Sequence, residues 1–150
     1  MESYQNTLKT LKLSSRRLYV LQIQNLNKLK EILEKDSRIM FAYTFGSAKN
    51  GKIEDRSDFD IAIYLTCNSS FEIIMDILRL IEKVILRVNI DLIILNGCEN
   101  AILKYEVIMG SLLFTKDDAF LAKHYSQTLR EYEDELIRLE RCKKYRRMAL

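Results

Sequence analysis

The sequence has few of the residues that mark cross-linked, metal-clustered or membrane-spanning proteins. Its 150 residues include no proline or tryptophan, four glycines, three cysteines and one histidine. Cys67, Cys98 and Cys142 lie far apart and form no CxxC pair, which argues against a disulfide framework or a zinc site. No apolar run reaches the roughly 18–20 residues of a membrane span, and no basic segment followed by an apolar run marks a secretory signal. These absences predict a soluble, cytoplasmic protein without a membrane contact.

Composition favours one compact α/β domain. Hydrophobic residues make up 48% of the chain and charged residues 30%, a balance that can bury a core. The length suits a single domain over residues 1–150, with its core at about 18–115 and a C-terminal helix at about 117–147. The formal net charge of +3 is too small to indicate nucleic-acid binding by itself.

Hydrophobic periodicity predicts helices and strands that alternate along the chain. Period-two or fully apolar runs indicate strands, and apolar residues three to four apart indicate helices. Ser69 and Glu72 have capping-box spacing, which predicts a helix start there. Together these patterns predict an α/β (α+β) fold with a small mixed sheet flanked by helices. The expected strands are 39–45, 58–65, 89–95 and 111–115, and the expected helices are 18–36, 70–86, 99–109 and a long one from about 117.

Three acidic residues fall at the starts of two predicted strands. Asp58 and Asp60 are two residues apart, so their side chains point to the same face of a strand. Asp91 lies early in the next strand and joins them if the two strands are neighbours. An unpaired carboxylate inside so apolar a strand is costly if buried, which makes Asp91 hard to explain as packing. An Asp-x-Asp pair alone is more often an ordinary strand-edge pair.

Carboxylates brought this close need a cation. Two unit charges 4 Å apart repel by about 4 kcal/mol at an effective dielectric constant near 20. Mg²⁺ suits such a site because it takes a few carboxylate oxygens together with substrate phosphates. Gly46 and Ser47 follow the first strand, where a glycine allows close approach of a polyphosphate. Lys49, Lys52 and Arg56 supply cations in the same loop, although a solvated turn explains that composition equally well.

These residues together resemble a known signature. Gly46-Ser47, nine intervening residues, Ser57-Asp58-Phe59-Asp60-Ile61 and a later Asp91 resemble the motif of the DNA polymerase β-like nucleotidyltransferases. Among these, the chain is most similar to the minimal MNT group, the MntA-like antitoxins of HEPN/MNT toxin–antitoxin pairs. The resemblance spans about residues 39–115, and the flanking helices are compatible with it.

The resemblance implies roles for individual residues. Asp58, Asp60 and Asp91 would be the catalytic metal ligands, and Gly46, Ser47, Lys49 and Ser57 would bind the nucleotide. The implied cofactor is Mg²⁺ and the implied substrate is ATP. The implied reaction transfers AMP from ATP to a tyrosine of a cognate HEPN-type ribonuclease toxin, which neutralises it.

One departure from the family pattern leaves a second function open. The family commonly has Ala-Arg-Gly in the loop, whereas this chain has Lys49-Asn50-Gly51. The alternative is therefore a weak or inactive enzyme that neutralises its partner by binding alone. Transfer to a small molecule is less attractive, because the chain is too short for a substantial acceptor domain.

The C-terminal helix allows two interpretations. Leu129, Tyr132, Leu136 and Leu139 interleave with charges, which indicates a helix with one face on the domain and a solvated basic end. The alternative is an arm that docks on a partner protein or on nucleic acid through its basic end. His124, the single histidine, lies in this helix far from the aspartates and is expected to be structural or exposed.

Overall fold

Four strands form one mixed sheet in the order β3-β2-β1-β4. The computed structural model describes residues 24–46, 58–86 and 88–149. All four predicted strands are present, three of them a residue shorter at one or both ends. Their bounds are β1 Ile39–Thr44, β2 Phe59–Leu65, β3 Ile90–Ile94 and β4 Ser111–Thr115.

Strand direction follows from the connections. β1 pairs antiparallel with both β2 and β4, whereas β2 and β3 are parallel. Parallel neighbours need a long crossover, and α2 (Phe71–Glu82) supplies it. The mixed sheet predicted from the sequence is confirmed.

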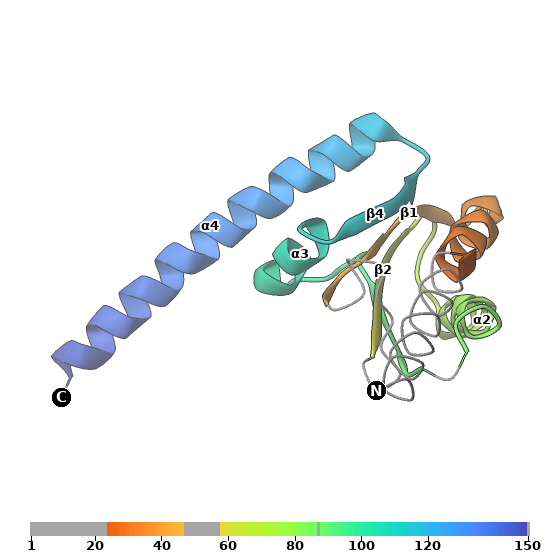
Figure 1. Ribbon diagram of the computed structural model, residues 1–150. Helices are drawn as coiled ribbons and strands as arrows, with labels where there is room; N and C mark the ends of the chain where they lie inside the picture. Colours follow the sequence, from red (N-terminus) through yellow and green to blue (C-terminus); the bar gives the residue numbers. More distant parts are fainter. Residues whose placement is uncertain (1–23, 47–57, 87, 150) are drawn as a thin grey trace, which may run out of the picture.

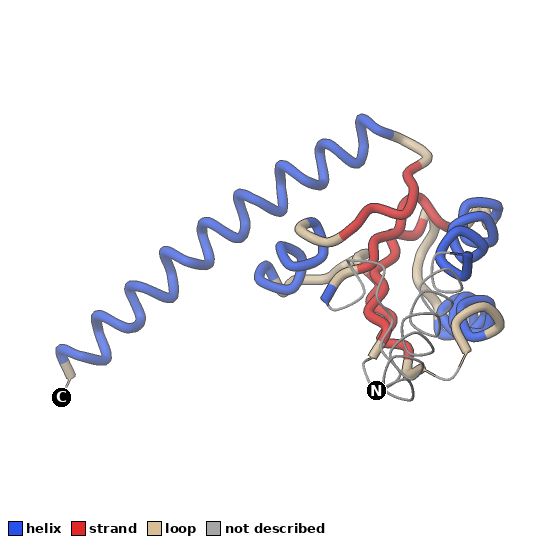
Figure 2. Tube along the Cα trace, in the orientation of Figure 1, coloured by secondary structure: helices blue, strands red, loops and turns tan. Residues whose placement is uncertain are grey.

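Helices cover both faces of the sheet. The helix at residues 24–35 and α2 lie on one face, and α3 (Ala101–Ile108) and the first half of α4 (Asp118–Met148) lie on the other (Figure 1). Figure 2 shows the same three layers as strands between helices. Residues 18–23 of the predicted first helix, and the segment before them, lie outside the described residues.

Alternation along the strands fills both layers. Ile61 and Ile63 pack with the helix at 24–35 and with α2, whose Ile77 and Ile81 are fully buried. The intervening Ala62 faces α3 in a second cluster. Each fully buried aliphatic side chain contributes about 1.5–3 kcal/mol, so this two-sided core holds β2 at the centre of the fold.

The start and end of α2 differ from the prediction. Ser70, not Ser69, caps the helix, and its hydroxyl accepts a hydrogen bond from the Ile73 amide at 3.3 Å. The helix ends at Glu82 instead of residue 86. Beyond it the Ile85 amide still donates to the Ile81 carbonyl at 2.8 Å. The apolar pattern continues past the helix end because the following turn remains buried.

Side-chain caps set the first residues of α3 and α4. Asn100 caps α3 by accepting from the Leu103 amide at 3.0 Å, so the helix begins at Ala101, two residues after the predicted start at 99. Asp117 caps α4 by accepting from the Phe120 amide at 2.9 Å, as predicted. A side-chain oxygen at this position satisfies an amide that has no partner within the helix.

The first half of α4 packs on α3. The Tyr105 and Tyr132 rings stack with centroids 3.8 Å apart, and Lys104 forms an ion pair with Glu131. His124 is half-buried against the Phe41 and Tyr64 rings, 5.2 and 5.6 Å between centroids, and burial lowers its pKa. Its position is structural, as expected.

The second half of α4 projects away from the domain (Figure 1). Residues 140–149 are all exposed, and so are the apolar side chains of Leu136 and Ile137. The prediction that one face of this helix packs on the domain therefore holds only for its first half. Within the described parts of the chain, no helix is long and apolar enough to cross a bilayer.

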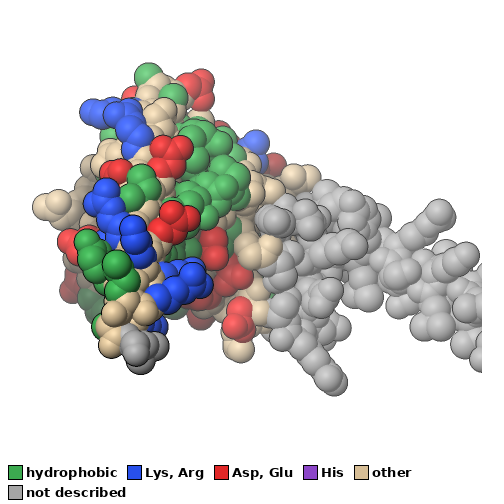
Figure 3. Space-filling view, turned by 90° about the vertical axis from the view of Figure 1, so that its left-hand side faces the viewer, with side chains coloured by type: hydrophobic (Ala, Val, Ile, Leu, Met, Phe, Trp, Pro, Cys, Tyr) green, Lys and Arg blue, Asp and Glu red, His purple; other side chains and the backbone are tan. Residues whose placement is uncertain are grey.

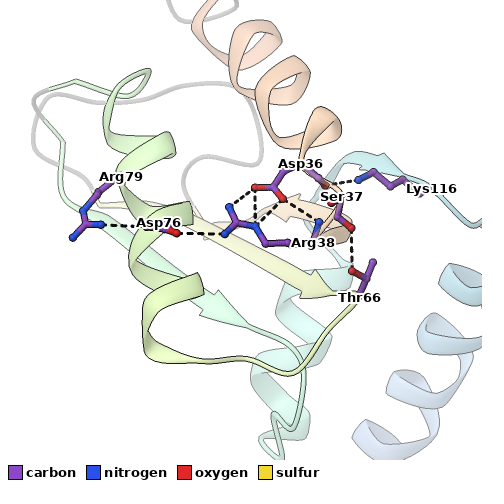
Figure 4. Close-up of polar contacts among 7 residues, drawn as sticks. All are labelled: Asp36, Ser37, Arg38, Thr66, Asp76, Arg79 and Lys116. Carbon is purple, nitrogen blue, oxygen red and sulfur yellow. Dashed lines mark hydrogen bonds and ion pairs between the residues drawn. The ribbon is translucent and has the colours of Figure 1, made fainter.

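A polar network fixes the turn between the helix at 24–35 and β1 (Figure 4). The Arg38 guanidinium donates to both Asp36 oxygens, at 2.9 Å from Nε and 2.7 Å from Nη2. Lys116 donates to the Asp36 carbonyl at 2.5 Å, and the Thr66 hydroxyl donates to the Ser37 carbonyl at 3.0 Å. These contacts tie the turn to β4 and to the end of β2.

This network predicts an acid-sensitive contribution to stability. The hydrogen bonds from Arg38 lower the pKa of Asp36 below 3.8, so the stabilisation is present above that pH and is lost as the pH falls through the folded-state value. Asp36→Asn should cost about 1–2 kcal/mol near neutral pH. In urea unfolding, the difference from wild type should shrink below pH 3.8.

Asp76→Asn is the matched control. Asp76 is half-exposed and lies 3.5 Å from Arg38, so its loss should change stability by less than about 0.5 kcal/mol. A pH-independent cost of Asp36→Asn would contradict the assignment.

Candidate active site

The three aspartates lie at one end of the β2–β3 pair. Asp60 and Asp91 are partners in the parallel register, and Asp58 directly precedes β2. Because side chains alternate along a strand, Asp58 and Asp60 point to the same face as Ala62, the face covered by α3. The prediction that the second and third strands are neighbours is confirmed.

Gly46 closes this end of the sheet. Its φ is +61°, a left-handed conformation that side chains disfavour, and a β-carbon built on it would overlap Oδ2 of Asp60. The Phe45 amide also donates to the Asp60 carbonyl at 3.2 Å. The backbone after β1 is therefore held directly against the Asp60 carboxylate, the position that the sequence predicted for a phosphate-binding turn.

Asp60 lies in a negative environment. Partial burial raises the pKa of its carboxyl above the usual range, and the charges of Asp91, Asp58 and Glu106 raise it further. Both causes disfavour an isolated negative charge at Asp60. A cation beside it would relieve the crowding.

Glu106 of α3 is an acidic neighbour that the sequence did not indicate. It is exposed on the helix that covers this face, and its charge acts on Asp60. The spacing of Glu106 from the aspartates in the sequence does not indicate that it lies near them. Its position depends on the angle at which α3 crosses the sheet.

The described residues supply no cation to this site. Within residues 24–46, 58–86 and 88–149, none of the three aspartate side chains forms an ion pair or a hydrogen bond. In the same residues, no three His, Cys, Asp or Glu side chains are arranged to hold a metal ion. The carboxylates share a face and a sheet end but do not converge on one point.

The prediction that Asp91 is a buried carboxylate is wrong. Asp91 is exposed, because β3 is the edge strand and Asp91 is its second residue. Its carboxylate stays hydrated, so there is no large desolvation cost. Its register opposite Asp60 is what connects it with the site.

The loop contribution stays a prediction. Ser47, Lys49, Asn50, Lys52, Arg56 and Ser57 lie outside the described residues, and only the two ends of the loop are defined. Those ends are Gly46 and Asp58, which both border Asp60.

Gly110 is a second close approach at this end of the sheet. A β-carbon there would overlap the Thr44 carbonyl oxygen and press on Phe45. The turn between α3 and β4 is thereby packed against the residues that lead into Gly46. Nothing in the sequence specifically indicated a close approach at Gly110.

Gly46→Ala should be more damaging than Gly97→Ala. Both glycines have positive φ, so alanine costs about 1–2 kcal/mol of backbone strain at either position. At Gly46 the new methyl also displaces the Asp60 carboxylate, whereas nothing lies within 4 Å at Gly97. Thermal unfolding of the two variants measures the difference, and equal melting temperatures would contradict the close contact.

The fold resembles solved toxin–antitoxin structures. A chain of the complex between tri-AMPylated Shewanella oneidensis HEPN toxin and MNT antitoxin matches with a TM-score of 0.62 and 18% identity, covering 86% of this chain and 99% of that one. A toxin–antitoxin structure with AMP-PNP matches at 0.63 and 19%, covering 84% and 99%. The MntA–HepT structure matches at 0.60 and 17%, covering 85% and 98%. No curated protein matches the chain.

A family model matches most of the chain. The model described as polymerase beta, nucleotidyltransferase matches residues 27–119. That range is well over half of the chain and contains Gly46 and all three aspartates. The protein therefore belongs to the polymerase β-type nucleotidyltransferase family.

Proposed function

We propose that the protein is a Mg²⁺-dependent protein adenylyltransferase that acts as an antitoxin. It transfers AMP from ATP to a tyrosine of a HEPN-type ribonuclease toxin and so neutralises that partner in the cytoplasm. The observation that carries the proposal is the register of Asp60 with Asp91 beside the Gly46 turn. The fold shared with the antitoxin complexes supports the choice of partner.

The donor set of the site suits a divalent cation. Asp58, Asp60 and Asp91 offer carboxylate oxygens, the ligands that Mg²⁺ prefers alongside phosphate. Asp58 and Asp91 are exposed, so their side chains can turn toward Asp60 without unpacking the core. When bound, Mg²⁺ supplies positive charge for the triphosphate and for the attacking oxygen.

The chain positions the nucleotide by its backbone. Gly46 has no side chain to block a phosphate, and its turn faces Asp60. We assign Ser47, Lys49 and Ser57 to triphosphate binding, through hydroxyl, amide and ammonium donors. Asn50 contributes an amide where the family commonly has a guanidinium.

The reaction is an in-line displacement at phosphorus. The tyrosine oxygen of the partner forms a bond to the α-phosphorus of ATP, and the bond from that phosphorus to the bridging oxygen of the β-phosphate breaks. Pyrophosphate leaves, and Asp91 favours removal of the tyrosine proton. Positioning and charge compensation by these residues account for catalysis of this type.

A second candidate function is neutralisation by binding alone. Asn50 favours it, since the family commonly has an arginine at this position and an amide carries no positive charge toward phosphate. The two functions differ in one respect. Only the enzyme needs Asp58 and Asp60 to protect cells.

The proposal predicts covalent labelling of the partner. Incubation with Mg²⁺, α-labelled ATP and the product of the adjacent gene should label a tyrosine on that product. Asp58→Asn/Asp60→Asn should lower the rate at least about 100-fold, because loss of even the groups supporting metal ligands costs 10–100-fold. Leu112→Ala, a surface change on β4 away from the aspartates, is the control.

A cell-protection assay with the same double variant distinguishes neutralisation by binding alone from adenylyl transfer. If the double variant still protected cells as well as wild type does, neutralisation would not need transfer and the proposed activity would be wrong. Protection lost together with labelling supports the enzyme.

Removing one charge should stabilise the metal-free protein. In Asp60→Asn the partly buried carboxylate no longer faces Asp58, Asp91 and Glu106. We expect a higher melting temperature without Mg²⁺ and a smaller stabilisation by Mg²⁺ with an ATP analogue than in wild type. A lower melting temperature without Mg²⁺ would contradict the like-charge account. Asp76→Asn, on α2 and remote from the site, should leave the response to Mg²⁺ unchanged.

A further inference from the structure

The projecting part of α4 carries its charges in two separate blocks. We call residues 131–148 the arm; its first two residues, Glu131 and Tyr132, still contact α3, and the whole segment extends about 27 Å at 1.5 Å per residue. Residues 131–135 contain four carboxylates and no cation, and residues 143–147 contain four cations and no carboxylate. In the view from the side to which the arm projects, Lys and Arg side chains lie among acidic and hydrophobic ones over much of the visible face (Figure 3).

The two blocks are mirror images about Leu139. The acidic block lies four to eight residues before it, and the basic block four to eight residues after it. In an antiparallel pair of arms crossing at Leu139, each acidic block lies beside the basic block of the other copy. Two-fold symmetry then repeats every favourable contact.

The charges that this pairing needs are available. Within the described residues, Lys143, Lys144, Arg146 and Arg147 form no ion pair, and Glu133 and Asp134 form none either. Glu135 pairs with Arg138 on the same helix and Glu131 with Lys104, so these two are partly neutralised already. The basic block is therefore the one that most lacks a partner.

Apolar side chains lie between the blocks. Leu136 is 42% exposed and Ile137 50% exposed, values that leave much of each side chain in water. Covering them adds an apolar centre to an otherwise electrostatic contact. A single projecting helix gains no such burial from its own domain.

We propose that the arm is a self-association surface, on which the arm of a second copy of this chain lies antiparallel. This inference is independent of adenylyl transfer, because the arm lies beyond the family match, which ends at residue 119. Nucleic acid fits the arm less well, since the acidic block would repel phosphates along half of its length. The contact is held by exposed charges, so it weakens with salt.

A charge-swap experiment tests the pairing with the full-length chain. Variant one reverses the basic block (K143E, K144E, R146E, R147E). Variant two reverses the exposed acids (E133K, D134K, E135K) and keeps Glu131, which contacts α3. Sedimentation equilibrium should show wild type as a dimer at low salt that dissociates at about 0.5 M salt, where screening is near complete beyond about 4 Å. Each variant alone should associate at least about tenfold more weakly.

The mixture of the two variants gives the decisive result. Variant one carries two acidic blocks and variant two carries a predominantly basic arm, so the two together should form a one-to-one heterodimer. A control with the same charge change elsewhere (K28E, K30E, K35E, K123E) should dimerise like wild type. Circular dichroism checks that the helix persists in each variant.

Two results would overturn the proposal. One is a wild-type protein that stays monomeric at low salt, including the case in which the arm binds RNA or another protein instead. The other is a mixture of the two variants that stays monomeric while both remain helical.

Discussion

The parallel pairing of β2 with β3 is the constraint on which the site depends. It sets Asp60 opposite Asp91, and the Phe59 amide fixes the start of the pairing by donating to the Asn89 carbonyl at 2.7 Å. A shift by one residue would turn one of the two carboxylates to the opposite face. The apolar residues that follow in both strands resist such a shift, because they are packed between two layers of helices. The packed core thereby offsets the repulsion between the Asp60 and Asp91 carboxylates, which have no cation from the described residues beside them.

The two ends of the sheet have different roles. At one end, the Asp36–Arg38 network ties the turn before β1 to its neighbours by charge-assisted hydrogen bonds. At the other end, Asp60 lies among like charges and against a glycine backbone. Polar groups are thus satisfied where the chain needs rigidity and left uncompensated where a ligand of opposite charge is expected. Charge crowding with a perturbed pKa, as at Asp60, is common at functional sites.

Much of the site could be predicted from the sequence because strands impose simple periodicities. Two-residue spacing put Asp58 and Asp60 on one face, and the apolar runs placed all four strands to within a residue at each end. The position of Glu106 could not be predicted, since it depends on how a helix crosses the sheet. The sequence also left open whether the second half of α4 packs on the domain or projects as a docking arm, because leucines such as Leu136 suggest a packed face whether the partner is the same domain or another chain.

The central claim is that the three aspartates share a divalent cation with a bound nucleotide. Anomalous diffraction from crystals grown with Mn²⁺ and a non-hydrolysable ATP analogue tests it directly. The account predicts a manganese peak about 2.2 Å from carboxylate oxygens of Asp60 and Asp91, with the triphosphate along the Gly46 turn. Nucleotide bound elsewhere, or manganese that contacts none of the three aspartates, would contradict it.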